Sequence, residues 1–332
     1  MWVVDRDGSG LEKISGGIGA TPDVDVARPQ WSPDGRYILQ GVFIFDNAAN
    51  SAAPHPFGLN VHDRSGTMRN SRRLVTSISS IPDARWSPDG SRVSYTADRL
   101  ILNEYQVFAI NIDGSGETRV TQNGDFLSES AWSPDSSLLA YLDHPSAPFP
   151  VDLFVSGATA GAPDTVLAFL SANGREVRNF AWSPDGQMLA YVANANADNV
   201  FELFVVPADG SSPGAAVNPP LAATADIFTF AWSPDSRRLA YAADQFANGV
   251  PTLFVVGADG SNNTHLMAGL SGEELGEFDW SDDGTLLRFS TGPESRTVNA
   301  DTIYSIAADG SGRVRISDGM LGAPILFKKR GR

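Results

Sequence analysis

Cysteine is absent from the 332 residues of the sequence. A disulfide framework and thiolate chemistry are therefore excluded, and cysteine usage does not indicate a redox compartment. Long apolar runs are missing too, since no stretch of about eighteen apolar residues occurs, and we expect no membrane-spanning helix. Residues 1–4 lead at once into a turn, and no secretory signal peptide is visible.

Positive charge is scarce. The sequence has 24 Lys and Arg residues against 39 Asp and Glu residues, which gives a formal net charge of -15 at pH 7. Because like charges repel, this balance disfavours binding to nucleic acid and to anionic membranes. We expect a basic protein or peptide as the partner.

Catalytic motifs are also missing. No Gly-x-Ser-x-Gly segment marks a serine hydrolase. The four histidines fall in different parts of the chain, so the sequence predicts solvent-exposed histidines rather than a metal site: His55, His62, His144 and His265. No catalytic residue and no cofactor can be named, which favours a non-enzymatic protein while leaving catalysis open.

What the sequence does contain is a repeat. A Trp-Ser-Pro-Asp-Gly turn, with small variations, recurs at Trp31, Trp86, Trp132, Trp182, Trp232 and Trp280. Ser, Pro, Asp and Gly at successive positions favour a type I turn. The spacing of roughly 50 residues suits one four-stranded propeller blade per repeat. One tryptophan per blade at a fixed position predicts packing between blades rather than a ligand platform.

A second turn, Asp-Gly-Ser, follows an apolar segment in most repeats, for example at Asp209, Asp259 and Asp309. Asp-Gly between two strands is a strong hairpin signal. Each repeat therefore predicts four strands: A ends at the tryptophan, B follows the proline turn, C precedes Asp-Gly, and D follows it. Strand B is apolar on both faces, as in residues 188–192, which indicates a sheet covered on both sides.

The predicted fold is all-β, a single β-propeller domain over residues 1–332 made of four-stranded antiparallel blades. Full blades are predicted to start near residues 27, 82, 128, 178, 228 and 276. Residues 1–16 contain an extra C–D hairpin, and residues 318–327 contain an extra strand A. We therefore favour seven blades, the last a composite of these two segments that removes free sheet edges, with six blades as the alternative.

These turns and strands resemble the TolB-like family of WD-type β-propeller repeats, which includes periplasmic TolB and the propellers of tricorn and prolyl oligopeptidase-type peptidases. The resemblance covers nearly the whole chain. It implies a periplasmic or extracellular location and a function in binding. The sequence departs from TolB in lacking a separate α/β domain, and from the peptidases in lacking a hydrolase domain.

The A–B and C–D turns are nearly uniform, whereas the D–A and B–C loops vary, so we expect binding on the face of the variable loops. Three residues before each tryptophan stands a polar residue: Arg28, Asp83, Glu129, Asn179, Thr229 and Glu277. A second polar set ends the B strands: Asp46, Asp98, Asp143, Asn194 and Asp244. These two sets, the first ring and the second ring, could hold a basic peptide, a sugar or a cation such as calcium. The alternative is that they are solvated strand ends.

Two functions remain. The first is a non-enzymatic binding or scaffold module of the TolB-like type, which engages a protein or peptide through the D–A and B–C loops. The alternative is a propeller-type glycosidase or polysaccharide lyase, which needs carboxylates converging on one point.

Overall fold

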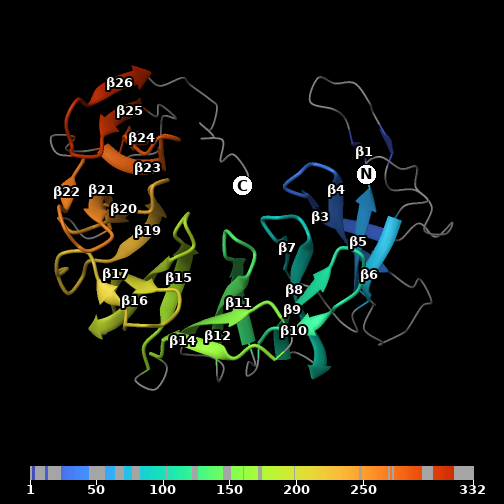
Figure 1. The fold of residues 1–332 in the computed structure, drawn as a ribbon. Coiled ribbons are helices and arrows are strands. Elements are labelled where there is room, and N and C mark those ends of the chain that lie inside the picture. Colours follow the sequence, from blue (N-terminus) through green and yellow to red (C-terminus); the bar gives the residue numbers. More distant parts are fainter. Residues whose placement is uncertain are drawn as a thin grey trace, which may run out of the picture. The chain divides into compact units, whose positions relative to one another are not determined.

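The computed structural model describes residues 2–3, 12–13, 24–44, 57–63, 71–76, 83–101, 104–121, 126–144, 151–159, 161–170, 174–197, 199–246, 249–267, 270, 273–293 and 302–317. Every regular element in these ranges is a β-strand, which confirms the all-β prediction. The strands form six four-stranded antiparallel sheets, here named sheet 1 to sheet 6 in chain order, and one two-stranded hairpin (Figure 1).

The strands of sheets 1 to 3 are β3 Val24–Trp31, β4 Tyr37–Ile44, β5 Phe57–Asp63, β6 Ser71–Thr76, β7 Ala84–Trp86, β8 Arg92–Ile101, β9 Glu104–Asn111, β10 Thr118–Arg119, β11 Phe126–Trp132, β12 Leu138–His144, β13 Asp152–Gly157 and β14 Asp164–Ala168. The strands of sheets 4 to 6 are β15 Val177–Trp182, β16 Met188–Ala197, β17 Val200–Pro207, β18 Ala215–Ala216, β19 Ile227–Trp232, β20 Arg238–Ala243, β21 Thr252–Gly257, β22 Thr264–His265, β23 Glu273–Trp280, β24 Leu286–Pro293, β25 Thr302–Ala307 and β26 Val314–Ser317.

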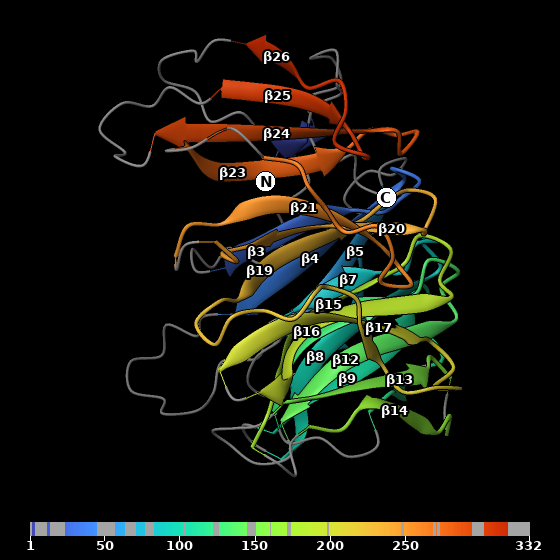
Figure 2. The same ribbon diagram turned by 90° about the vertical axis from the view of Figure 1, so that its left-hand side faces the viewer.

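In each sheet the four strands lie side by side in chain order, as Figure 2 shows for β23 to β26. The first strand of every sheet ends at the repeat tryptophan, so strands A, B, C and D fall where the turn pattern predicts them. This order arises because each strand is joined to the next by a short turn or loop, and antiparallel neighbours can be joined that way.

The chain forms two compact units. One comprises Met1–Ala147, Val155–Asp164 and Gly331–Arg332, and the other comprises Pro148–Phe154 and Thr165–Arg330. Sheets 1 and 2 belong to the first unit and sheets 4 to 6 to the second, while the boundary passes through sheet 3.

The A–B turn is held by its serine and its aspartate. In sheet 4 the Ser183 hydroxyl donates to Asp185 Oδ1 at 2.6 Å and accepts from the backbone N–H of Met188 at 3.0 Å. Gly186 closes the turn at a φ of 72°, a left-handed conformation that glycine adopts without steric cost. The recurring Ser-Pro-Asp-Gly motif is therefore a self-contained structural unit.

Two sheets carry serine in place of this glycine. Ser136 and Ser236 adopt φ values of 64° and 61°, which cost a residue with a Cβ about 1–2 kcal/mol. Each hydroxyl accepts the N–H of the turn aspartate in the preceding sheet, Asp89 or Asp185, at 3.0 Å. The backbone strain is offset by a hydrogen bond between neighbouring sheets.

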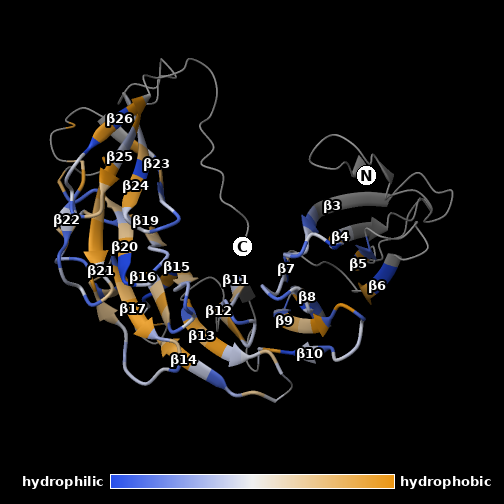
Figure 3. Ribbon diagram, turned by 45° about the horizontal axis from the view of Figure 1, so that its top comes forward, coloured by the Kyte–Doolittle hydropathy of each residue, from blue (hydrophilic) through white to orange (hydrophobic). Residues whose placement is uncertain are grey.

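The tryptophans of sheets 5 and 6 pack against the preceding sheet, as predicted, whereas Trp31 of sheet 1 is 46% exposed. Trp232 and Trp280 are buried, and their indole N–H groups donate to the carbonyls of Ala181 and Ala231 in the preceding sheet, each at 3.1 Å. The same core contains apolar residues of the C and D strands, and Figure 3 shows such residues along β17 and β21. Hence sheet 5 buries one face in sheet 4 and the other in sheet 6, which explains its continuous apolar B strand.

The two-stranded hairpin consists of β1 Trp2–Val3 and β2 Glu12–Lys13. Its register pairs Trp2 with Lys13 and Val3 with Glu12. The C–D pair of sheet 5 has the same spacing, because Phe254 pairs with His265 and Val255 with Thr264. The hairpin therefore matches a C–D pair, while the strand A predicted within residues 318–327 lies outside the described residues.

Candidate functional site

The first ring of polar residues lies beside a recurring β-bulge in strand A. In β19, Ile227 pairs with Ala243 and Thr229 with Ala242, so Phe228 has no opposite residue. The same shift occurs in β3, β11, β15 and β23. A bulge re-aims side chains and is frequent beside functional sites.

In the second unit the bulge brings side chains to the surface. Phe228 is 47% exposed, which is unusual for a strand phenylalanine in an otherwise apolar sheet. Thr229 and Glu277 of the first ring are also exposed, as is Gly276 beside Glu277. The bulges of sheets 5 and 6 therefore present an aromatic ring, a hydroxyl and a carboxylate to solvent.

Arg178 occupies the bulge of sheet 4. Its guanidinium lies 3.1 Å from the centroid of the Phe201 ring. It also approaches Asp226 Oδ2 at 3.5 Å and Glu176 Oε1 at 3.9 Å. Because Asp226 belongs to the loop before β19, Arg178 ties sheet 4 to sheet 5. These contacts hold the guanidinium of Arg178 against neighbouring side chains of the protein.

In the first unit three charged side chains lie close together: Asp83, Arg85 and Glu129. Arg85 pairs with Asp83 at 2.9 Å, and both interact electrostatically with Glu129. Although Glu129 as a residue is exposed, burial of its carboxyl raises its pKa, an effect that Arg85 opposes and Asp83 reinforces. A carboxyl with a raised pKa beside a second carboxylate is a feature of binding and catalytic sites alike.

The remaining first-ring residues differ. Asn179 is half-buried, and its Oδ1 is buried without a hydrogen-bond partner in the described part of the chain. Arg28 lies in β3, but its side chain is outside the described residues. The first ring is thus a set of similar positions with different exposure, rather than one uniform surface.

The second ring does not consist of solvated strand ends. Asp98, Asp143, Asn194 and Asp244 are all less than a tenth exposed, and Asp46 lies outside the described residues. Asp244 accepts the N–H groups of Asp226 at 2.6 Å and Gly249 at 2.7 Å. Asn194 accepts the N–H of Glu176 at 2.7 Å. Such buried acceptors satisfy backbone donors of the loops, so in sheets 4 and 5 these two side chains support the loop structure.

Two histidines correct the sequence prediction. His62 and His265 are half-buried rather than exposed, and burial lowers the pKa of both. His265 packs with its ring centroid 4.9 Å from that of Phe254 and 4.8 Å from that of Phe246. His55 and the side chain of His144 lie outside the described residues.

Among the described residues, no group of three or more His, Asp and Glu side chains is arranged to hold a metal ion. Within the same residues, no helix is long and apolar enough to cross a membrane.

The arrangement of sheets is matched by solved structures at low sequence identity. Dipeptidyl peptidase 4 from Porphyromonas gingivalis matches with a TM-score of 0.65 and 14% identity over 90% of this chain and 47% of that chain. Oligogalacturonate lyase from Vibrio parahaemolyticus matches with a TM-score of 0.55 and 13% identity, covering 96% and 84%. The β-propeller domain of the Trilobed protease from Pyrococcus furiosus matches with a TM-score of 0.52 and 10% identity, covering 89% and 86%.

The chain is built of β-propeller blades. Sheets 1 to 6 are accordingly its blades 1 to 6. Structural neighbours of the TolB, tricorn and prolyl oligopeptidase kinds are all found at low identity, as the sequence resemblance implies. The TolB proteins themselves match with TM-scores of 0.46 and 0.43, too low to support an argument from their structures. No described protein family matches the sequence.

Sequence reasoning missed Phe228 and Arg178. Both stand one residue before the first ring, at the position that the bulge leaves without an opposite residue. A bulge has no strong sequence signal here, because the bulge residue is Phe in one blade, Arg in another and Gly in a third. The one sequence feature that could have indicated the exposed phenylalanine is that Phe228 stands next to the polar Thr229 near the start of strand A.

Proposed function

We propose that the chain is a non-enzymatic binding module that takes a basic protein or peptide at the blade ends carrying the D–A and B–C loops. The supporting observation is the strand A bulge, which exposes Phe228, Thr229 and Glu277. An exposed aromatic ring attracts Lys and Arg side chains through cation–π contacts, and carboxylates pair with them. The net charge of -15 adds a long-range attraction for the same partners.

The fold alone permits other functions. A dipeptidyl peptidase and an oligogalacturonate lyase share it with this chain at 14% identity or less. Function therefore has to be argued from the side chains on the loop face. On the same sequence resemblance to TolB, we propose a periplasmic or extracellular location.

The direct test is binding of a fluorescently labelled oligolysine peptide, measured by anisotropy. We expect binding that weakens when the ionic strength rises from about 0.01 M to about 0.15 M, because the Debye length falls from about 30 Å to about 8 Å. An oligoglutamate peptide is expected not to bind. Equal binding of the two peptides, or no binding of oligolysine at low salt, would contradict the proposal.

The position of the site is tested by two substitutions that remove the same charge. Glu277→Gln removes a carboxylate from the bulge end and is expected to weaken oligolysine binding about twofold to fivefold, the range of an exposed ion pair. Asp282→Asn is the control, because Asp282 is exposed in the A–B turn at the opposite end of the same blade. An equal effect of both would indicate attraction by net charge without a site.

A second candidate function is a propeller-type glycosidase or polysaccharide lyase. The observation that favours it is that two carboxyl groups, Glu129 and Asp83, lie close enough together that, besides burial, the charge of Asp83 raises the pKa of Glu129. Incubation with acidic and neutral polysaccharides, followed by reducing-end and unsaturated-product assays, separates the two functions. Product formation that disappears in Glu129→Gln would replace the binding proposal.

We also propose that a seventh, composite blade completes the fold, formed by the N-terminal hairpin and a strand within residues 318–327. Large apolar side chains that are exposed in the first and the last blade support this proposal. Trp31 is 46% exposed, whereas its counterpart Trp280 is 5% exposed. At the other end Ile316 is 55% exposed, whereas its counterparts Leu266 and Val217 are 1% and 4% exposed because the next blade covers them. Apolar faces of this kind require a cover.

A further inference from the structure

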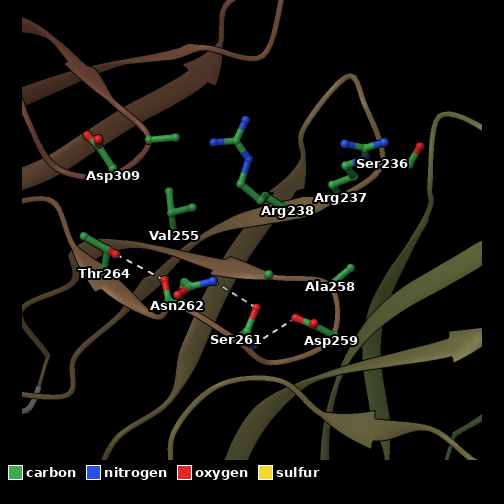
Figure 4. A pocket seen from close by; sticks show the side chains of 12 residues that line it. Ser236, Arg237, Arg238, Val255, Ala258, Asp259, Ser261, Asn262, Thr264 and Asp309 are labelled. Atoms are coloured by element: carbon green, nitrogen blue, oxygen red, sulfur yellow. Dashed lines mark hydrogen bonds between the residues drawn. The ribbon is translucent and has the colours of Figure 1, made fainter.

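A pocket of about 740 Å³ opens between blades 5 and 6, at the end opposite to the bulges (Figure 4). Its walls are the A–B turn of blade 5, the C–D turn of blade 5 and the start of the C–D turn of blade 6. The volume falls within the range of about 300–1,000 Å³ that small-molecule sites occupy. The turns of blades 5 and 6 therefore border an open pocket.

In blade 2, an arginine crosses the space that corresponds to this pocket. Its counterpart in blade 5, Arg238, leaves that space open. Arg92, the first residue of β8, donates to the carbonyl of Ala158 in the next blade at 2.7 Å. Arg238 is the first residue of β20, and its hydrogen bond goes to Gly284 at 2.7 Å. Ala308, which corresponds to Ala158, lines the pocket instead. The pocket lies where Arg238 would reach Ala308 if it made the contact that Arg92 makes with Ala158.

Charges of both signs line the pocket. Arg237 is exposed, and its guanidinium makes no hydrogen bond or ion pair within the described ranges. Asp259 and Asp309 also line the pocket, and each accepts the N–H of the serine two residues on at 2.9 Å. Hydrogen bonds from these serines lower the pKa of both carboxyls, which stay ionised at neutral pH. Figure 4 shows Asp309 and Arg237 on either side of Arg238.

This layout selects the ligand by its charges. A simple anion would be repelled by Asp259 and Asp309, and a simple cation by Arg237 and Arg238. A ligand that carries both charges pairs with each side. Between the charged groups the lining is small and apolar at Val255, Ala258 and Ala308, which suits short aliphatic groups.

We propose that this pocket binds a small zwitterionic ligand, such as a short peptide with both termini free, whose carboxylate pairs with Arg237 and whose ammonium pairs with Asp309. Both peptide termini are charged at neutral pH, since their ordinary pKa values are about 3.5 and about 7.8. The site lies at the opposite blade ends from the oligolysine site, so either can fail without the other.

The test is calorimetric titration with three peptides of one sequence: trialanine, N-acetyl-trialanine and trialanine amide. The acetyl group removes the positive terminus, and the amide removes the negative one. We expect trialanine to bind about twofold to fivefold more tightly than either blocked peptide, the range of an exposed ion pair, because Arg237 and Asp309 are both exposed. Absence of saturable binding by trialanine, or equal binding of all three, would overturn the proposal.

Variants assign each end of the ligand. Arg237→Gln is expected to remove the preference for trialanine over its amide while the preference over the acetylated peptide stays. Asp309→Asn is expected to do the reverse. Arg36→Gln is the control, since Arg36 is an exposed arginine paired with Asp63 at 3.4 Å in blade 1. If Asp309→Asn lowers the unfolding temperature, Arg237→Gln decides alone, and an unchanged preference in that variant refutes the site.

Discussion

At the scale of single residues, the repeat depends on side chains that bond their own backbone. In each A–B turn from blade 1 to blade 6, the serine hydroxyl and the aspartate carboxylate each accept a backbone N–H of the same turn. In blade 6, hydrogen bonds from Ser281 and from Thr285 lower the pKa of Asp283 from 3.8 to about 2. A carboxyl with a lowered folded-state pKa stabilises the fold in its ionised form.

The pH dependence follows from the sign of this shift. Because the pKa of Asp283 is lower in the folded state, its stabilising effect is full above pH 3.8 and is lost as the pH falls toward 2. We expect Asp283→Asn to have a lower unfolding temperature than the wild type at pH 7. Its unfolding temperature should then fall less steeply between these two pH values, as measured by thermal unfolding followed by circular dichroism.

Asp282→Asn serves as the comparison for this variant, because it changes the neighbouring exposed carboxylate without touching the serine contact. The same slope in both variants would mean that the turn contact does not set the acid sensitivity.

At the scale of elements, the C–D turn of one blade packs on strand D of the blade before it. A Cβ added to Gly210 would stand 2.7 Å from Thr165 Cγ2, and one added to Gly310 would stand 3.1 Å from Thr264 Cγ2. The Asp-Gly-Ser turn thus needs glycine for two reasons: its left-handed backbone and its close approach to the neighbour.

Two glycine substitutions separate these reasons. Gly210 and Gly312 have φ values of 69° and 64°, but nothing lies within 4 Å of a Cβ added to Gly312. We expect Gly312→Ala to lower the free energy of unfolding by about 1 kcal/mol through backbone strain alone. Gly210→Ala adds a steric clash and should cost a further 1–3 kcal/mol or so. Denaturant unfolding measures both, and equal losses would mean that the turn moves away freely.

The strands and turns were largely predictable, and Thr229 and Glu277 were named from the sequence, whereas Phe228 and Arg178 were not. Strand A ends at its tryptophan in all six blades because the proline turn is a local feature. From the sequence the second ring could be either a ligand-holding set or solvated strand ends, since Asp244 looks like any polar strand end until its contacts with the N–H groups of Asp226 and Gly249 are known. Those partners lie across a loop and cannot be assigned from local sequence.

At the scale of the whole molecule, the open question of chain closure has a direct test. Trp232→Ala is expected to cost about 3–5 kcal/mol of stability, the usual loss for a large buried side chain. If the composite blade covers Trp31, Trp31→Ala should cost about as much, although Trp31 is 46% exposed to solvent in the structure. Thermal and denaturant unfolding of both variants gives the comparison.

Removal of residues 1–16 provides the control for closure. In the shortened chain the effect of Trp31→Ala should shrink, because the N-terminal hairpin that covers the indole is gone, while the effect of Trp232→Ala should stay. A small effect of Trp31→Ala in the full chain would instead favour six blades with this face uncovered.

The sequence by itself determined the architecture of each blade. The turn residues, the apolar B strands and the six tryptophans act over a few residues, and their physical preferences do not depend on distant partners. The cysteine-free composition likewise excludes thiolate chemistry, and the acidic composition is the basis for expecting a basic partner.

Tertiary structure decided which side chains are available for function. The bulge that exposes Phe228 depends on the pairing of strands A and B, the burial of Asp244 depends on the loops whose N–H groups it accepts, and the pocket beside Arg237 depends on how blade 5 meets blade 6. Blade packing is a long-range property, because residues about 50 positions apart in the chain become neighbours. For that reason the repeat could be identified from the sequence, whereas the exposure of Phe228 and the pocket beside Arg237 could be found only in the folded chain.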